Sequence, residues 1–341
     1  MGSLAALAEA PPEVAGKPPP VNLAAAVEQA ARLRRLHSLL VSWHGDLILE
    51  RYFHGGRSSR PANIKSVSKS VLSALTGIAI ERGLIAGVNA PIVPYFPDQL
   101  GEDADPVKRA ITIEDLLTMR SGLESTSGRN YGAWIRSPNW VRYVLSRPVL
   151  SQPGERMDYS TGNSHLLSAI LTRVSGTSTW EFARDALARP LGIRLAPWQR
   201  DPQGIYLGGN NMEMTPREML AFGELYLNRG SANGRQIVPE AWVEASFVPR
   251  ARSHWSDELY GYGWWIGELV GRPAYYAWGY GGQLIFVVPD LRLVVVTTSS
   301  ATPDPQRRSH RRAVFDLVAR LIVQPLAGPT KDRGGRASLR D

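Results

Sequence analysis

Apolar residues recur at two different spacings along the 341-residue chain. Near the N-terminus, the apolar runs 37–43 and 47–53 flank a turn of His44, Gly45 and Asp46, which is the pattern of a β-hairpin. Sheet is expected again near the C-terminus, where short turns separate further apolar runs. The four strands predicted there cover residues 260–266, 274–280, 283–288 and 293–297.

Between these runs the apolar residues recur with the period of an amphipathic helix. Two of the helices have clear start signals, because Thr112 precedes acidic residues and Thr215 precedes Pro216. A third helix ends at Ser175 and Gly176, since glycine commonly closes helices. The expected helices cover residues 24–36, 63–79, 112–119, 131–145, 166–174, 179–187, 216–227, 239–247 and 311–323.

This order of elements predicts the α/β (α+β) class, with an antiparallel sheet flanked by helices and an inserted all-helical domain. Residues 22–64 and 235–325 would form a discontinuous α/β sandwich domain, and residues 65–234 a mainly helical domain. Residues 1–21, rich in proline and alanine, and residues 326–341, rich in glycine, arginine and serine, are expected to be disordered. A cleft between two domains is a usual place for a binding site.

The composition excludes several classes of protein. The chain has no cysteine, which rules out disulfides, thiolate metal sites and a cysteine nucleophile. No apolar stretch reaches the roughly 20 residues that a membrane-spanning helix needs. The net charge of +8 comes from scattered arginines and a basic tail without a nucleic-acid-binding module, so we expect no nucleic-acid partner. Compartment and oligomeric state stay open: residues 4–10 fit the remnant of a trimmed signal peptide, which would make the protein periplasmic or secreted, and otherwise it is cytoplasmic.

Ser66 and Lys69 are three residues apart in the predicted helix 63–79, which puts both side chains on one side of its first turn. Serine needs a neighbouring base to act as a nucleophile, and a lysine is that base when burial or positive charge lowers its pKa. Only five of the 39 basic residues are lysines. A chain that prefers arginine elsewhere therefore has lysine at position 69, where arginine could not act as a base.

Several other motifs of hydrolytic and cofactor-dependent sites are absent. The sequence has no Gly-x-Ser-x-Gly elbow, no phosphate loop ending in Gly-Lys-Ser/Thr and no His-Glu-x-x-His. The six histidines show no metal-ligand spacing, and lone histidines are usually structural or solvated. Residues 279–282 are rich in glycine but lead into a predicted strand and not into a helix, so they form no dinucleotide fingerprint. We therefore expect neither a metal nor a cofactor.

Three motifs remain: Ser66-x-x-Lys69, the loop Tyr159-Ser160-Thr161, and Trp278-Gly279-Tyr280 before a strand. Their order and spacing resemble the serine β-lactamase and penicillin-binding-protein superfamily, whose motifs are Ser-x-x-Lys, Ser/Tyr-x-Asn and Lys-Thr-Gly. The sequence is similar above all to the class C-like branch of esterases, D-peptidases and nylon-oligomer (6-aminohexanoate-dimer) hydrolases, which uses tyrosine in the second motif. The resemblance covers about residues 36–325 and includes phrases such as 208–212.

Two positions depart from the motifs of that superfamily. Thr161 stands where the family often has asparagine. Either Ala277-Trp278-Gly279 or Trp278-Gly279-Tyr280 stands where the family has Lys-Thr-Gly, whose lysine helps to hold the carboxylate of a β-lactam or of a peptide terminus. Without that lysine, the resemblance favours an esterase or amidase over an enzyme that hydrolyses β-lactams.

The resemblance implies a role for each motif. Ser66 would attack a carbonyl carbon, and either Lys69 or Tyr159, as a phenolate, would take the serine proton. Tyr159 would also donate a proton to the leaving group. The backbone N–H groups of Ser66 and Tyr280 would form the oxyanion hole. The candidate substrate-binding residues are Trp278 and Gly279, with Tyr131 and Trp134 from the aromatic segment 131–145, which we expect to be helical and partly exposed.

The sequence therefore predicts a serine hydrolase that cleaves a carboxylic ester or a small linear amide through an acyl-enzyme on Ser66. Lys69 and Tyr159 would relay the proton, and the substrate would be a small molecule. One alternative is a β-lactam-recognising enzyme, either a β-lactamase or a D-peptidase. The other is a catalytically silent binding relative, which Thr161 and the missing third-motif lysine keep open.

Overall fold

The structure, a computed structural model, describes residues 21–327. Its main sheet has eight strands in the order β2-β1-β12-β11-β10-β9-β8-β7, and neighbouring strands pair antiparallel. The N-terminal hairpin pairs with the last strand, so the two ends of the chain build one sheet. The strands of this sheet are β1 (Leu36–Trp43), β2 (Asp46–Tyr52), β7 (Ala251–Arg252), β8 (Leu259–Tyr260), β9 (Trp265–Leu269), β10 (Arg272–Gly279), β11 (Gln283–Val288) and β12 (Leu293–Ser299).

Two small sheets and the helices complete the fold. The small sheets pair β3 (Ala62–Asn63) with β4 (Glu213–Met214) and β5 (Ser231–Ala232) with β6 (Arg235–Gln236). The α-helices are α1 (Ala24–Arg32), α2 (Ser68–Glu81), α3 (Pro106–Arg109), α4 (Ile113–Leu117), α5 (Tyr131–Ile135), α6 (Trp140–Leu145), α7 (Thr161–Ser175), α8 (Thr179–Ala183), α9 (Arg189–Leu191), α10 (Pro216–Leu227), α11 (Glu240–Ser246), α12 (Arg307–Val318) and α13 (Gln324–Ala327). Short 3₁₀ turns are η1 (Lys65–Val67), η2 (Val93–Tyr95), η3 (Gly128–Asn130) and η5 (Pro289–Leu291), and π-helical turns are η4 (Arg184–Ala188) and η6 (Ala319–Val323).

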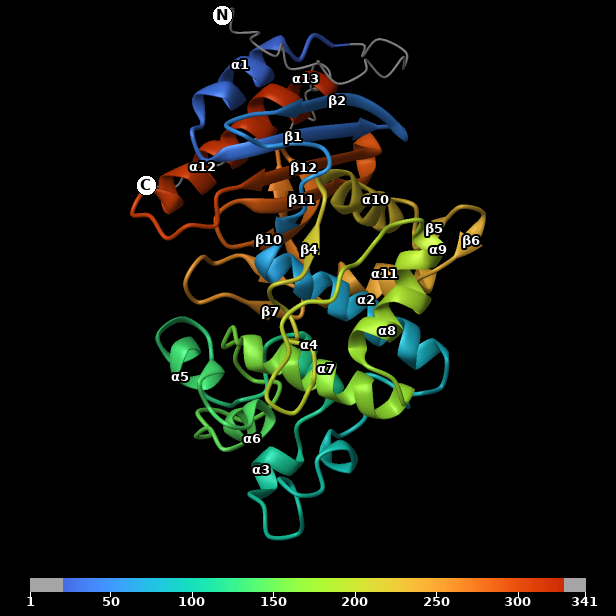
Figure 1. The fold of residues 1–341 in the computed structure, drawn as a ribbon, viewed down its shortest axis with the longest axis vertical. Helices are drawn as coiled ribbons and strands as arrows, with labels where there is room; N and C mark the ends of the chain where they lie inside the picture. The colour runs from blue at the N-terminus through green and yellow to red at the C-terminus, as the bar shows by residue number, and fades with distance from the viewer. Residues whose placement is uncertain (1–20, 328–341) are drawn as a thin grey trace, which may run out of the picture.

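Helices cover both faces of the main sheet, with α1, α12 and α13 on one face and α10 on the other (Figure 1). Because side chains alternate across a strand, neighbouring residues of β12 face opposite cores. Val295 lies in the core under α1 and α12, and Val294 and Val296 lie in the core that includes α10 and α2. Both faces are therefore buried, which explains why the strands are nearly continuous apolar runs.

Helix α10 approaches the sheet closely at Gly223. A Cβ at this position would lie 2.6 Å from Cγ1 of Val294 and 2.7 Å from Cγ2 of Ile285, so the approach requires glycine. The helix starts as the sequence predicts, with Thr215 closing a capping box. α10 belongs to the predicted helical domain, residues 65–234, yet it packs on the sheet. The division of the chain into two domains stays a prediction.

Helices α2 and α7 pack together at the centre of the helical part of the molecule (Figure 1). Helix α7 begins at Thr161 and is followed by Gly176, whose φ of 66° is the left-handed cap that the sequence predicts. Helix α4 has the predicted cap as well, because Thr112 and Asp115 form a capping box.

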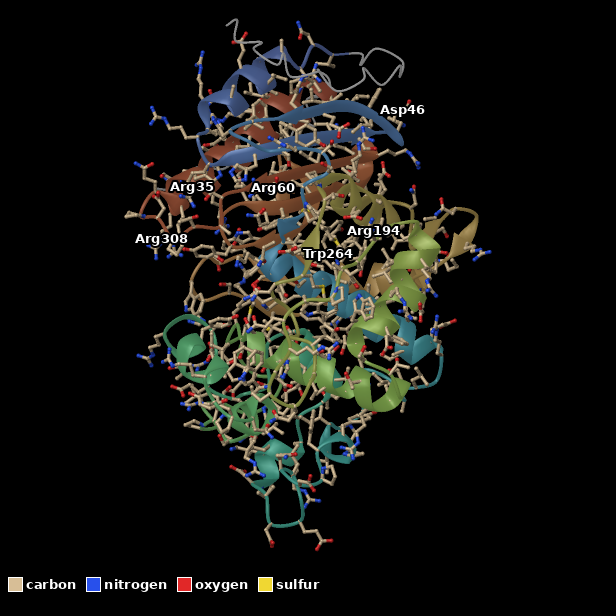
Figure 2. All side chains as sticks on the ribbon, viewed as in Figure 1. Arg35, Asp46, Arg60, Arg194, Trp264 and Arg308 are labelled. Atoms are coloured by element: carbon tan, nitrogen blue, oxygen red, sulfur yellow. The ribbon has the colours of Figure 1, made fainter. Side chains whose placement is uncertain are left out.

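Figure 2 shows Trp264 in the middle of the molecule, and this side chain has no exposed surface.

The first and last predicted helices have different boundaries in the structure. The first, 24–36, ends at Arg32, because Leu36 already begins β1 and pairs with β12. The last, 311–323, begins earlier, at Arg307. In both cases the apolar pattern correctly predicts that a helix is present. The residues at which each helix begins and ends depend on neighbouring segments, which the local pattern does not contain.

The predicted disordered tail, 326–341, starts inside a helix, because α13 ends at Ala327. The rest of that tail, residues 328–341, lies outside the described residues, and so do residues 1–20 of the predicted arm. Within residues 21–327, no helix combines the length and the apolar character that crossing a bilayer would require.

The aromatic segment 131–145 differs from its prediction in two ways. It forms two short helices, α5 and α6, because Pro138 lies between them and cannot supply a helical N–H. The expected partial exposure is wrong for its tryptophans, since Trp134 is 0% and Trp140 2% exposed. Both rings pack into the core of the helical part of the molecule.

The predicted strand 260–266 is interrupted. β8 ends at Tyr260 and β9 starts at Trp265, and between them the chain leaves the sheet to pack on α2. Gly263 makes this contact with a φ of 76°, and a Cβ there would lie 2.9 Å from the carbonyl oxygen of Lys69. The short strand β7 was not predicted, because two residues are too few to show an alternating pattern.

The packing of α2 on α11 yields a stability prediction. Gly77 of α2 lies against Trp242, and a Cβ there would be 2.4 Å from the indole ring. In an exposed helix, replacing glycine by alanine stabilises by up to about 1 kcal/mol. Here we expect Gly77→Ala to lower the free energy of unfolding by about 1–3 kcal/mol, because the added methyl overpacks the core.

Urea unfolding would measure this change. Gly267→Ala is the matched control, because its new Cβ would lie 3.7 Å from the Tyr276 ring, an ordinary contact. The control should shift the free energy of unfolding by no more than about 0.5 kcal/mol. A Gly77→Ala protein that is more stable than the wild type would contradict the packing of α2 on Trp242.

Candidate active site

The structure brings Ser66 and Lys69 together. The Nζ atom of Lys69 lies 3.1 Å from the Oγ atom of Ser66. Ser66 lies in the 3₁₀ turn η1, and Lys69 in the first turn of α2, which begins at Ser68. The predicted helix 63–79 therefore starts as a 3₁₀ turn, and residues three apart still share one side of it.

Lys69 is almost completely buried, with 3% of its surface exposed. Its Nζ atom has three oxygen partners: Oγ of Ser66 at 3.1 Å, Oγ1 of Thr161 at 3.3 Å and the carbonyl oxygen of Gly209 at 2.8 Å. None of these three partners carries a negative charge, so they offset only part of the loss of water. Burial accordingly lowers the pKa of Lys69 to about 7. Near neutral pH, a large share of the amine is unprotonated and can accept a proton.

The backbone in front of Ser66 is held in an unusual conformation. Lys65 has a φ of 52°, and a non-glycine residue in the left-handed region costs roughly 1–2 kcal/mol. Hydrogen bonds hold the turn: the N–H of Lys65 donates to Oδ1 of Asn63 at 3.1 Å, and its Nζ lies 3.4 Å from Oδ1 of Asn211. This turn ends β3 and places Ser66 at the start of the helical segment.

Tyr159 lies half-buried in the loop before α7, where its ring centroid is 4.9 Å from Nζ of Lys69. The hydroxyl of Ser125 donates to the Tyr159 carbonyl at 2.7 Å, and the Trp265 ring stacks on the phenol ring at 5.8 Å. Burial raises the pKa of Tyr159 well above its usual value, although a hydrogen bond with Ser66 opposes the rise. The phenol is therefore neutral at physiological pH and can donate a proton.

Thr161, where the family often has asparagine, is a buried partner of Lys69. Its hydroxyl lies 3.0 Å from Oγ of Ser127, and its N–H donates to the same oxygen at 2.8 Å. A hydroxyl can both accept and donate, so Thr161 can accept from Lys69 while it donates to Ser127. No motif marks Ser127, which is 34 residues away in the chain, and the sequence did not reveal its role.

The end of β10 lies against the turn before Ser66. A Cβ on Gly279 would be 2.2 Å from the carbonyl oxygen of Ile64 and 3.1 Å from Cβ of Lys65, so this position requires glycine. Among the described residues, neither the N–H of Ser66 nor that of Tyr280 donates to another protein group. Two unpaired N–H groups from facing segments are what an oxyanion hole requires.

The remaining candidate substrate-binding residues have different environments. Trp278 is half-buried, and the guanidinium carbon of Arg311 lies 3.7 Å from its ring centroid. Tyr131 is also half-buried, and its hydroxyl accepts from Nδ2 of Asn210 at 3.1 Å. Trp134 is a correction: it has no exposed surface, and its indole N–H donates to a carbonyl of α6 at 3.1 Å. It is a core residue and does not line a binding site.

Gly209 supplies the third partner of Lys69, and the sequence assigned no role to it or to Gly208 before it. A Cβ on Gly209 would lie 2.7 Å from Cγ of Lys69, and one on Gly208 would lie 2.1 Å from the carbonyl oxygen of Ser164. Both positions therefore require glycine, because the backbone packs directly on α2 and α7. Two consecutive glycines within a phrase typical of the family are a signal that could have marked this segment.

The structure brings together a hydroxyl, a buried amine with a lowered pKa and a neutral phenol, and two unpaired N–H donors lie on the adjoining turn and strand end. These are the groups that acyl transfer needs: a nucleophile, a base, an acid and a stabiliser of negative charge. Over residues 21–327, no three His, Asp or Glu side chains are arranged to hold a metal ion.

Comparison with known proteins identifies the family. Residues 37–319 match the model of the Beta-lactamase family. Over 294 residues the chain is 25% identical to the 6-aminohexanoate-dimer hydrolase of Paenarthrobacter ureafaciens, covering 77% of this chain and 72% of that protein. Over 253 residues it is 24% identical to Esterase EstB of Burkholderia gladioli, covering 67% of this chain and 64% of the esterase.

The fold agrees with this assignment. The structure of EstCE1, described as a hydrolase with promiscuous acyltransferase activity, superposes with a TM-score of 0.68 at 19% identity, covering 86% of this chain and 98% of that one. The antiparallel sheet with flanking helices, predicted from the sequence, is confirmed as a β-lactamase-like fold. Because the family model covers most of the chain, the protein belongs to the Beta-lactamase family and is a hydrolase.

Proposed function

We propose that the protein is a serine hydrolase that cleaves a carboxylic ester or a small linear amide through an acyl-enzyme on Ser66. The observation that carries this proposal is the buried amine of Lys69, 3.1 Å from the Ser66 hydroxyl, with a pKa lowered to about 7. A lysine with an ordinary pKa would be protonated at neutral pH and could not accept the serine proton.

The directions of the two pKa shifts separate the roles of Lys69 and Tyr159. Burial makes the amine neutral by lowering its pKa, and it keeps the phenol neutral by raising its pKa. Tyr159 is then no phenolate, so Lys69 is the base that takes the proton of Ser66. The protonated amine can return this proton through the Tyr159 hydroxyl to the leaving oxygen or nitrogen.

The complete reaction has two halves. Oγ of Ser66 bonds to the carbonyl carbon, and the bond to the leaving alcohol or amine breaks as that group takes the relayed proton. Water then attacks the acyl-enzyme and gives a proton to the amine of Lys69, and Ser66 regains a proton as the carboxylic acid leaves. The N–H groups of Ser66 and Tyr280 stabilise the oxyanion in both halves, each worth several kcal/mol in such sites.

The third motif supports an ester or linear amide as the substrate. Trp278, Gly279 and Tyr280 supply two aromatic residues and no lysine where the family places one for a carboxylate. Two relatives point the same way, since one is a 6-aminohexanoate-dimer hydrolase and the other an esterase. A β-lactam-recognising enzyme and a silent binding protein are the alternatives that the first test separates.

The first prediction from the proposed function concerns the nucleophile. A fluorophosphonate probe should label the wild-type protein, and Ser66→Ala should remove the label together with hydrolysis of p-nitrophenyl acyl esters. Ser73→Ala is the matched control on the adjoining helix α2, because the Ser73 hydroxyl is buried without a hydrogen-bond partner among the described residues. A label that persists in Ser66→Ala refutes the assignment. If the wild-type protein hydrolyses neither esters nor linear amides above the Ser66→Ala background, the catalytically silent binding protein is favoured. Stable acylation by a fluorescent penicillin would favour the β-lactam-recognising enzyme.

The second prediction concerns protonation. The rate of fluorophosphonate labelling should rise with pH to a plateau, with a midpoint near the Lys69 pKa of about 7, because only the neutral amine accepts the serine proton.

Tyr159→Phe should lower kcat for an ester by about 10²- to 10⁴-fold, since the relay loses its hydroxyl. A Tyr159→Phe enzyme with wild-type kcat would exclude Tyr159 from proton transfer.

The third prediction concerns the free energy of unfolding, which the buried amine of Lys69 lowers. Since the pKa of Lys69 falls from 10.5 to about 7 on folding, the unfolded chain binds more protons between these values, and wild-type stability rises with pH across that window. Below about pH 7, the buried amine of the folded protein is mostly protonated and carries its charge. We expect Lys69→Met to raise the free energy of unfolding by about 1–3 kcal/mol at about pH 6, with a smaller gain at about pH 10. A gain that urea unfolding finds equal at both pH values would contradict a buried, titrating amine.

A further inference from the structure

A buried histidine and aspartate form a pair that the proposed reaction does not use. Nε2 of His165, on α7, lies 3.1 Å from Oδ2 of Asp201, and neither side chain has any exposed surface. The rings of Trp134 and Trp140 approach His165 edge-on, with centroid distances of 5.6 and 5.3 Å. An unpaired polar atom would be costly in such an apolar setting, so the hydrogen bonds of both side chains have to be complete.

The hydrogen bonds define the tautomer of His165. The N–H of Gly208 donates to Nδ1 at 3.3 Å, so Nδ1 carries no proton and the ring proton lies on Nε2, which donates to Asp201. The other carboxylate oxygen of Asp201 accepts from the N–H groups of Gln203 and Ile205 at 2.9 and 2.8 Å. The carboxylate is thus bound on both oxygens, and His165 presents a single acceptor to the Gly208 backbone.

Gly208 directly precedes Gly209, which contacts Lys69, the candidate base. The carbonyl oxygen of Gly209 accepts from Nζ of Lys69 at 2.8 Å, and the Gly209 backbone covers the Lys69 side chain closely. Helix α7 contributes twice, because it carries His165 and also Thr161, whose Oγ1 lies 3.3 Å from the same Nζ atom. The pair and the amine are therefore joined by one short stretch of backbone and one helix.

We propose that His165 and Asp201 are positioning residues for catalysis: they hold the Gly208–Gly209 backbone against Lys69, so that the amine keeps its acceptor and stays shielded from water. The inference rests on the proposed role of Lys69 as the base. In this arrangement Asp201 acts on the Lys69 amine through the His165 ring and a peptide group, and it touches neither the substrate nor the nucleophile.

The groups that face Lys69 decide how loosening this backbone would act. Among residues 21–327, the ionisable side chain that packs against the amine is Tyr159, which is neutral, and the polar partners are the hydroxyls of Ser66 and Thr161 and the carbonyl of Gly209. Burial is the cause of the lowered pKa of Lys69. Water admitted beside Gly209 would therefore raise this pKa toward its ordinary value.

Asp201→Asn tests the proposal with almost no change in volume. The asparagine oxygen can still accept from Gln203 and Ile205, but its NH₂ group then faces Nε2 of His165. This moves the ring proton to Nδ1, where it opposes the Gly208 N–H, an effect analogous to the wrong tautomer produced by the same substitution in a serine protease triad. We expect fluorophosphonate labelling to slow roughly tenfold, and the midpoint of its pH dependence to rise by about half a unit or more.

Two substitutions of His165 separate the halves of the pair. His165→Asn keeps an oxygen near the position of Nδ1, so it can accept from Gly208 while the link to Asp201 is lost. His165→Gln reaches Asp201 with its amide nitrogen and loses the acceptor for Gly208. We expect a raised labelling midpoint in His165→Gln and a midpoint near the wild-type value in His165→Asn, with urea unfolding measured in parallel.

The outcomes discriminate clearly. A pair with a purely structural role would lower the unfolding free energy of all three variants and leave the labelling midpoint of each at the wild-type value, which would overturn the proposal. Failure of the wild-type protein to label would instead remove the proposed function. In wild-type protein, imidazole ¹⁵N shifts should report the Nε2–H tautomer at a pH on the plateau of the labelling profile. A proton on Nδ1 there would also overturn the proposal, even if no variant folds.

Discussion

The candidate site depends on the burial of one amine. Lys69 has lost nearly all contact with water, and its three partners are two hydroxyls and a carbonyl, with no carboxylate among them. Such an arrangement stabilises the neutral amine over the ammonium ion, which is unfavourable for folding at acidic pH and favourable for proton transfer. The rest of the site can be understood as the structure that keeps this amine dry and correctly placed.

Segments from most of the chain converge on the amine because α2 lies between the sheet and the other helices (Figure 1). Thr161 comes from the start of α7, Gly209 from the loop before β4, and Gly263 from the bend between β8 and β9, which packs on the Lys69 carbonyl. Each close approach uses a glycine or a small hydroxyl side chain. A larger residue at these positions would open a path for water or displace Lys69.

The sequence predicted features that are encoded locally. The N-terminal hairpin, the cap of α10 at Thr215 and the end of α7 at Gly176 each follow from a few adjacent residues. Features set by distant contacts were missed: the interruption at Gly263 exists because α2 lies there, and Trp134 is buried because other helices cover it. The candidate site follows the same division. The spacing of Ser66 and Lys69 is local, whereas the contacts made by Gly209, Ser127 and His165 are not.

The same physical cause explains why an arginine-rich chain has lysine here and tyrosine opposite it. Burial disfavours the charged form of every group, so it lowers the pKa of an amine and raises that of a phenol. Lys69 and Tyr159 therefore become neutral together, one able to accept a proton and the other able to donate one. An arginine would keep its charge in the same place and could do neither. Two neutral groups also let a proton pass between nucleophile and leaving group without leaving an uncompensated charge in the resting site.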